Sequence, residues 1–142
     1  MLREPRHSRQ VVHQSQYHVV WCTKYRLKLL GPAESKLLKQ VVRDLADETD
    51  SVLLTVETDQ DHVRILIDVH PQYGIDRFVR LAKGRTSHAI REQFPKTKSR
   101  APSLWTHSWF VSTADKAPLD EIRSYIESQQ ERPTTRSGRA SR

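Results

Sequence analysis

The sequence predicts an α+β fold in which two helices cover one face of an antiparallel sheet. Short β-branched or aromatic stretches are separated by two longer stretches whose apolar residues repeat at helical spacing. Their order along the chain is strand, helix, strand, strand, helix, strand. This order is typical of the split βαβ, or ferredoxin-like, pattern. A further helix is expected after the last strand, and 142 residues suffice for one domain with a buried core.

The first half of the predicted domain comprises a strand, a helix and the start of a hairpin. Residues 16–23 are β-branched and aromatic, which predicts the first strand. A Gly-Pro pair then interrupts regular secondary structure. After it, apolar residues at helical spacing predict a helix that ends at about Glu48. A second strand is expected at residues 52–57, and the polar residues 58–61 form the turn to the third.

The third strand is the most regular stretch of the sequence. From Asp61 to Pro71, apolar residues alternate with more polar ones, which predicts one apolar and one largely polar face. His62 and Arg64 lie on the polar face. Because the two helices are expected on the apolar face, the polar face is left for a ligand or for the last helix.

The second half of the domain begins with the second helix, predicted over residues 75–94 by its apolar spacing. Gly84 is expected to weaken or bend the middle of this helix. Residues 95–102 are predicted to form a basic loop, and the aromatic residues within 104–113 predict the fourth strand. A last helix is expected over residues 118–130.

The charge of the chain is +7 and is unevenly distributed. Residues 1–14 are predicted to be a flexible basic arm, residues 15–130 the domain, and residues 131–142 a disordered basic tail. Within the domain, residues 75–100 hold eight Lys or Arg against two acidic residues. Such clustering favours a polyanionic partner, most simply nucleic acid, over a helix face that is merely solvated.

Neither a membrane nor an oxidising compartment is indicated by the sequence. No apolar run is long enough to cross a bilayer. The lone Cys22 has no partner for an internal disulfide and is expected to be a buried strand residue. We therefore expect a cytoplasmic protein that associates with the nucleoid when it binds DNA.

Tyr125 and Gln129 are the candidate reactive residues of the last helix. They are four residues apart, so they lie on one face of that helix. A tyrosine that faces an active site can attack a phosphodiester and hold one DNA end covalently. The alternative is a tyrosine that packs an amphipathic helix and a glutamine that faces solvent.

Five motifs in the same order and spacing resemble the single-tyrosine HUH transposases, called TnpA, of the insertion sequence 200/605 family. The resemblance covers about Tyr17 to Gln130. The motifs are Tyr17 to Arg26, Thr58 to His62, Ala82 to Ser87, Leu104 to Ser108, and Tyr125 to Gln129. It implies a ferredoxin-like IS200-like domain, in agreement with the fold predicted from the residues themselves.

The resemblance also implies a reaction. Tyr125 would be the nucleophile that cleaves single-stranded hairpin DNA at element ends through a 5′-phosphotyrosine link. His62 and Gln129 would be ligands of a divalent metal, Mg²⁺ or Mn²⁺. The protein would be a homodimer in which each tyrosine helix completes the partner's site in trans. Our candidates for contact with DNA phosphates are Lys24, Arg26, Lys83, Arg85 and Arg91.

Arg64 departs from this pattern, because the family has its second metal-binding histidine there. A guanidinium offers no lone pair to a metal and repels a cation. Two replacements remain open: Arg64 could itself grip the phosphate, or His18 or His107 could supply an imidazole. A second departure is Ala114-Asp115-Lys116, where family members have paired glycines before the tyrosine helix.

The function that follows is DNA transposition by a single-tyrosine enzyme whose activity the Arg64 substitution calls into question. The alternative is a catalytically inactive or domesticated dimer that binds single-stranded DNA hairpins. An RNA-binding module of the same fold is a third alternative. It is disfavoured because His62 and Arg64 stand where stacking aromatic rings are expected.

Overall fold

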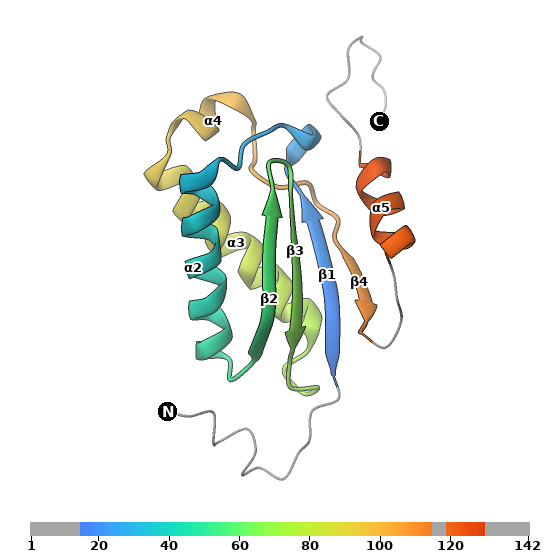
Figure 1. Cartoon of the computed structure of the whole chain (residues 1–142). Coiled ribbons are helices and arrows are strands. Elements are labelled where there is room, and N and C mark those ends of the chain that lie inside the picture. Colours follow the sequence, from blue (N-terminus) through green and yellow to red (C-terminus); the bar gives the residue numbers. More distant parts are fainter. Residues whose placement is uncertain (1–14, 115–118, 130–142) are drawn as a thin grey trace.

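A four-stranded antiparallel sheet forms the centre of the molecule in a computed structural model that describes residues 15–114 and 119–129. The strand order is β2-β3-β1-β4, and each neighbouring pair is antiparallel (Figure 1). The ferredoxin-like pattern predicted from the sequence is therefore confirmed. The strands are β1 (Gln16–Cys22), β2 (Val52–Asp59), β3 (His62–Asp68) and β4 (Phe110–Thr113).

Two long helices, α2 (Pro32–Glu48) and α3 (Ile75–Gln93), pack together on one face of the sheet. The alternation predicted for the third strand determines which face this is, because Val63, Ile65 and Ile67 of β3 are fully buried beneath the helices. Each fully buried large apolar side chain contributes about 1.5–3 kcal/mol. The core includes Val19, Trp21, Leu38, Val42, Leu45, Val63, Ile65, Ile67, Phe78, Val79 and Ile90.

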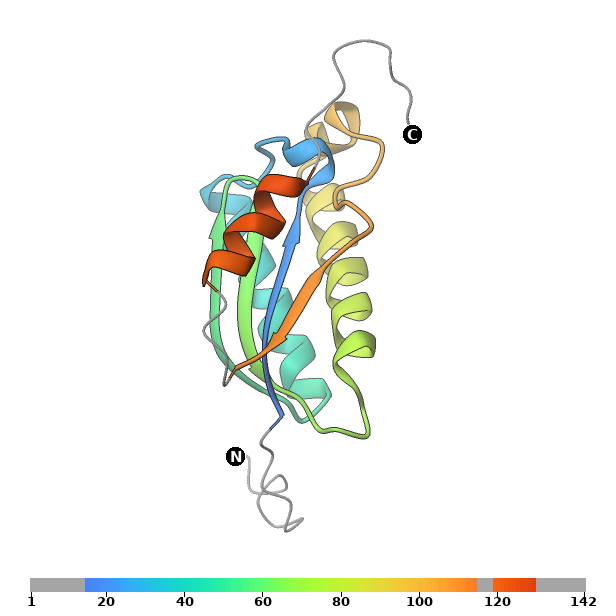
Figure 2. The ribbon, with the colours of Figure 1, turned by 90° about the vertical axis from the view of Figure 1, so that its right-hand side faces the viewer.

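The last helix, α5 (Leu119–Ser128), packs against the opposite face of the sheet (Figure 2). Its Tyr125 ring lies 5.8 Å from the ring of Phe110 on β4, measured between centroids. Near its start, Leu119 and Ile122 approach Arg64 of β3. The polar face of β3 is thus covered by the last helix, one of the two occupants that the sequence left open.

Two glycines affect α3 in different ways. Gly74 precedes the helix with φ of +91°, a backbone conformation that L side chains rarely adopt, so this position favours glycine. Gly84 lies inside the helix, which continues through it without interruption. A Cβ atom at Gly84 would meet no atom within 4 Å. The structure therefore gives Gly84 no packing role.

The prediction for residues 95–113 was partly wrong. The expected basic loop contains a short helix, α4 (Lys96–Arg100), because the buried Thr97 anchors a turn through its hydroxyl on the Phe94 carbonyl. The fourth strand begins only at Phe110. The residues before Phe110, which were expected to belong to this strand, instead pass the end of β1, where Trp105 forms an isolated bridge with Thr23.

Several expectations fall outside the described residues. These are the basic arm at 1–14, the tail at 131–142 and the Asp115-Lys116 part of the position where the family has glycines. Within the described ranges, no helix combines the length and apolar character needed to span a membrane.

Candidate active site

The register of the sheet places the predicted site residues on the face beneath α5. Val20 of β1 pairs with Arg64 on one side and with Phe110 on the other. Cys22 of β1 pairs with His62, two residues further along. Because side chains alternate between faces along a strand, His62, Arg64 and Phe110 share one face.

Tyr125, Ser108 and Gln129 form a hydrogen-bonded cluster at the C-terminal half of α5. The Ser108 hydroxyl donates to Oε1 of Gln129 at 3.0 Å. The Tyr125 hydroxyl lies 2.8 Å from the Ser108 oxygen. Since the serine has a single proton to donate, the arrangement has Tyr125 donating to Ser108 and Ser108 donating to Gln129. The predicted pair, Tyr125 and Gln129, is thus brought together through a serine.

Burial changes the acidity of Tyr125. It raises the pKa of Tyr125 to about 12, although the hydrogen bond with Ser108 acts in the opposite direction. At neutral pH the phenol is therefore protonated. A nucleophilic attack by this oxygen requires the proton to be removed.

His62 is oriented by its neighbour Asp61. The Nδ1 atom of His62 lies 2.8 Å from Oδ1 of Asp61, and the same carboxylate pairs with Arg26 at 3.4 Å. When Nδ1 carries the proton for this bond, Nε2 is left with the lone pair. A carboxylate behind a histidine is the usual support for a histidine that binds a ligand or metal.

Arg64 is paired with Glu57 directly across β2 and β3, where the two residues are register partners. Hydrogen bonding and charge from Arg64 lower the pKa of Glu57. The pair borders a cavity of about 220 Å³ with Leu119 and Ile122 of α5. Arg64 is thus directed toward β2 and lies near the start of α5. Tyr125 lies further along α5 and contacts β4.

Of the two proposed substitutes for the missing histidine, His18 does not lie beside His62. His18 pairs with Leu66, four residues from His62 along β3, a separation of about 13 Å along the strand. Burial, followed by the charge of Arg64, lowers the pKa of His18. His107 is exposed on the segment that precedes β4.

The described residues do not provide a complete metal site. No group of three or more His, Cys, Asp or Glu within residues 15–114 and 119–129 could hold a metal ion. Of the positions that the resemblance predicts to be metal ligands, His62 has a donor atom and Arg64 does not. Gln129 retains its amide oxygen, which accepts the Ser108 hydrogen bond.

The five predicted DNA contacts are engaged within the protein itself. Lys24 lies over the Tyr25 ring at 5.3 Å, and Arg26 pairs with Asp61. Lys83 donates to backbone carbonyls of residues 106–108. Arg85 donates to the Glu48 carboxylate, and Arg91 donates to the backbone carbonyls of Ala101 and Pro102. Their contact with DNA stays a prediction.

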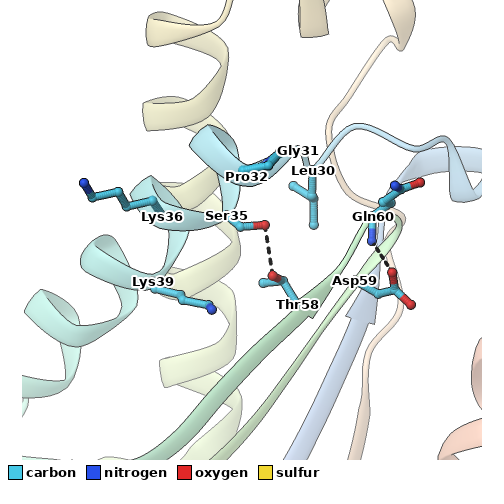
Figure 3. Close-up of a pocket in the computed structure, with 9 residues that line it drawn as sticks. All are labelled: Leu30, Gly31, Pro32, Ser35, Lys36, Lys39, Thr58, Asp59 and Gln60. Carbon is cyan, nitrogen blue, oxygen red and sulfur yellow. Dashed lines mark hydrogen bonds between the residues drawn. The ribbon is translucent and has the colours of Figure 1, made fainter.

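A separate hollow of about 480 Å³ lies where α2 begins beside the β2–β3 turn (Figure 3). A hydrogen bond between Thr58 and Ser35 joins strand and helix at its floor. Lys36 and Lys39 extend from α2 at its rim. None of the predicted site residues borders it, so it is distinct from the tyrosine cluster.

Sequence reasoning did not identify Ser108, Asp61, Phe110 or Glu57 as parts of the site. Ser108 and Asp61 lie inside motifs that carry the family resemblance, which was a usable signal. The partners of Phe110 and Glu57 depend on strand register, which the sequence alone did not specify.

Comparison with known proteins identifies the family. The family model for IS200-like transposases matches residues 11–129. The ISDra2 transposase TnpA of Deinococcus radiodurans is 32% identical over 131 residues, covering 91% of this chain and 94% of the relative. A transposase for insertion sequence element IS200 from Salmonella typhimurium is 28% identical, covering 81% of this chain and 76% of the relative.

Two solved structures share the fold. The crystal structure of a Deinococcus radiodurans protein described as a transposase has a TM-score of 0.77 and 32% identity, covering 82% of this chain and 92% of that one. A REP-associated tyrosine transposase bound to a REP hairpin has a TM-score of 0.57 and 8% identity, and the match covers 83% of this chain and 66% of that one. At 8% identity this likeness shows the fold alone. On the family match and the 32% identical relative, the chain belongs to the IS200-like transposases, DNA-binding proteins of DNA transposition.

Proposed function

We propose that this transposase binds single-stranded hairpin DNA at element ends and cleaves and rejoins it with Tyr125 as the nucleophile. One observation carries the proposal: the Tyr125 hydroxyl clusters with Ser108 and Gln129 over the sheet face that also holds His62. Polar groups that can orient the Tyr125 hydroxyl therefore lie beside it, which supports the proposal. The family membership supplies the reaction class.

In the proposed step, the Tyr125 oxygen attacks the scissile phosphorus and the bond from phosphorus to the 3′-oxygen breaks. The phenol gives up one proton and the released 3′-oxygen takes up one, so the step is balanced. The 5′-phosphotyrosine retains the energy of the phosphodiester, and a 3′-hydroxyl can attack it to rejoin DNA. No external energy source is required.

The family generally uses a divalent metal ion, and we propose that this chain holds Mg²⁺ or Mn²⁺ only weakly. His62 and Gln129 are the donors that remain, and Arg64 adds a positive charge to the same face. The pairing of Arg64 with Glu57 offsets part of that charge. We expect the scissile phosphate to depend more on protein groups than it does where both histidines are present.

We propose that Lys24, Arg26, Arg85 and Arg91 contact the DNA backbone. The same contact was predicted for Lys83, which is set apart by its internal hydrogen bonds. The internal partners of the arginines are carboxylates and backbone carbonyls, and of the ion pairs among them only Arg85–Glu48 is exposed. A phosphate can compete with such acceptors for the arginine donors. Cationic side chains of this kind provide sequence-independent affinity through counterion release.

We also propose a homodimer that exchanges its tyrosine helices. In this structure Tyr125 contacts Ser108 of its own chain. Exchange of α5 between two identical chains would recreate the same contact, because the receiving surface is the same in both. Each site would then combine His62 of one chain with Tyr125 of the partner subunit.

A labelled single-stranded hairpin, incubated with Mg²⁺, Mn²⁺ or chelator and analysed on a denaturing gel, tests the proposal. We expect a covalent protein–DNA adduct in the wild type and none in Tyr125→Phe. A Tyr73→Phe control removes a distant tyrosine and should leave the adduct intact. An adduct of equal yield in Tyr125→Phe would contradict the proposal.

The second candidate function is a hairpin-binding dimer without cleavage activity. It is favoured by Arg64, which stands where the family resemblance predicts a metal ligand and which pairs with Glu57. Under this alternative the wild type binds the hairpin, forms no adduct, and gains cleavage in Arg64→His. An adduct in the wild type excludes it.

A further inference from the structure

Lys83 of α3 makes an unusual set of contacts for a lysine on a basic helix. Its ammonium nitrogen donates to the backbone carbonyls of Thr106, His107 and Ser108, at 2.7, 3.0 and 3.2 Å. The same nitrogen lies 5.1 Å from the centroid of the Trp109 ring. A lysine ammonium has three protons to donate. All three are therefore accounted for by three successive carbonyls of one segment.

The segment 105–109 is attached to α3 at a second point beside Lys83. The indole nitrogen of Trp105 donates to the Lys83 carbonyl at 3.1 Å and to the Thr86 hydroxyl oxygen at 3.0 Å. This anchor is buried, whereas residues 107 and 108 beyond it are exposed and belong to neither strand nor helix. The Lys83 ammonium is thus the contact that fixes the outer part of the segment.

The outer part of this segment is where the tyrosine site begins. Ser108 offers its carbonyl to Lys83 and its hydroxyl to Tyr125 and Gln129. A continuous path of hydrogen bonds and one residue of backbone therefore connects the Lys83 ammonium to the Tyr125 oxygen. A change in the position of the Ser108 backbone would therefore move the hydroxyl that is hydrogen-bonded to the Tyr125 oxygen.

We propose that Lys83 is a positioning residue of the tyrosine site: by holding the carbonyls of residues 106–108, it fixes the Ser108 hydroxyl that orients Tyr125. The proposal deepens the proposed function and, for its catalytic effect, rests on Tyr125 being the nucleophile. It differs from the prediction that Lys83 contacts a DNA phosphate, because a phosphate would have to displace the carbonyls that already use its protons.

Lys83 is partly buried, unlike a lysine that extends into solvent toward DNA. Burial lowers the pKa of Lys83 to about 8, and at neutral pH the ammonium is still mostly charged. The titratable group that acts on it is the Cys22 thiol of β1. Burial raises the pKa of that thiol to about 12, so it stays neutral over the same range.

The direct test uses tyrosine labelled with carbon-13 and follows the Tyr125 ring signal by NMR in the full-length protein without DNA. The signal is assigned by its loss in Tyr125→Phe. Lys83→Met keeps the apolar stem and removes all three donors, and Ser108→Ala removes the hydroxyl. We expect both variants to shift the Tyr125 signal in the same direction. Arg80→Met, which removes an exposed charge from the same helix, should leave it unchanged.

The variant Lys83→Arg provides a second test in case Lys83→Met does not fold. It keeps the charge, but a planar guanidinium cannot direct its donors at three adjacent carbonyls in the same way. We expect a smaller shift of the Tyr125 signal in the same direction. An unchanged Tyr125 signal in Lys83→Met, or in Lys83→Arg if the first variant does not fold, would overturn the proposal.

A second measurement separates positioning from DNA contact. If Lys83 positions Tyr125, Lys83→Met retains hairpin affinity and its salt dependence, while single-turnover cleavage falls on the order of 10- to 100-fold. If Lys83 contacts a phosphate, affinity falls and the salt slope shrinks by about one contact, which contradicts the proposal. The NMR result needs no cleavage, so the failure of the proposed reaction and the failure of this inference are distinguishable.

Discussion

Arg64 stands where the family resemblance predicts a second metal-binding histidine. It contributes a positive charge where a metal ligand is expected, and Glu57 holds it. Arg64→His should allow Mn²⁺ to bind the DNA-free protein more tightly, because the change removes the repulsion and adds a donor beside His62. Calorimetric titration measures this affinity. Arg64→Gln is the matched control, since it removes the charge without supplying an imidazole.

Equal Mn²⁺ affinity in Arg64→His and Arg64→Gln would mean that charge alone limits metal binding. Unchanged affinity in both variants would contradict the account, because neither the charge nor the missing imidazole would then matter. In either variant Glu57 loses its partner, so thermal unfolding should be followed in parallel.

The proposed roles of Tyr125 as nucleophile and Lys83 as positioning residue predict how cleavage depends on pH. The reactive form of Tyr125 is deprotonated, and with a pKa of about 12 its fraction rises tenfold for each pH unit below that value. The competent form of Lys83 is protonated, and its fraction falls above a pKa of about 8. The product of the two fractions rises with pH up to about 8 and is level above it.

In Lys83→Arg the upward slope should continue past pH 8, because arginine stays protonated. Single-turnover cleavage rates measured between about pH 6 and 10 test this difference. Identical profiles for the wild type and Lys83→Arg would show that the charge of Lys83 does not govern the reaction.

At the scale of residues, sequence patterns indicated which side chains share a face but not which partners hold them. Helical spacing puts Tyr125 and Gln129 on one face of the last helix, and strand alternation puts His62 on the polar face of the third strand. Their roles in the reaction come from the family resemblance and stay predictions. Ser108 could not be placed, because its role depends on contacts with a helix 17 to 21 residues away. Lys83 was predicted to face DNA, since nothing in a basic helix distinguishes a buried ammonium from an exposed one.

At the scale of elements, Gly84 offers a clean stability test. It lies within α3, and an added Cβ would meet nothing within 4 Å. Gly84→Ala should therefore raise the free energy of unfolding by about 1 kcal/mol through helix propensity. Gly74→Ala is the opposing control, because φ of +91° strains any L side chain. Chemical denaturation measures both, and a Gly84→Ala variant less stable than wild type would contradict the expectation.

The long periodic elements were predictable and the short irregular ones were not. Helices α2 and α3 and strands β1 to β3 lie close to their expected bounds, because each has a sustained apolar pattern. The short β4 and α4 were misjudged. In that region aromatic residues suggested a continuous strand, yet Trp105 is used for an anchor to α3 instead. Tertiary contacts there outweigh local β propensity.

At the scale of the whole molecule, the concentration of charge predicts a salt-sensitive affinity for DNA. The stretch 75–100 holds eight basic residues against two acidic ones. Hairpin affinity should fall more than about tenfold between about 50 and 200 mM salt, because each phosphate contact releases counterions. Fluorescence anisotropy with a labelled hairpin measures the slope. An affinity independent of salt would contradict the proposed backbone contacts.

The exchange of tyrosine helices is testable by mixing two inactive variants. One subunit carries Tyr125→Phe and the other His62→Ala. If helices are exchanged, one site of the mixed dimer combines an intact His62 with an intact Tyr125 from the partner, and cleavage returns to up to half of its wild-type level. No recovery would show that each chain uses its own α5. Each variant alone is the control.

The most direct test of the central claim is to locate the DNA on the protein. The chain has four tyrosines, so an adduct with hairpin DNA can be digested with nuclease and protease and the modified peptide sequenced by mass spectrometry. We predict a nucleotide bound through phosphate to Tyr125 and to no other tyrosine. A nucleotide on another residue, or no adduct in either the wild type or Arg64→His, would contradict this prediction.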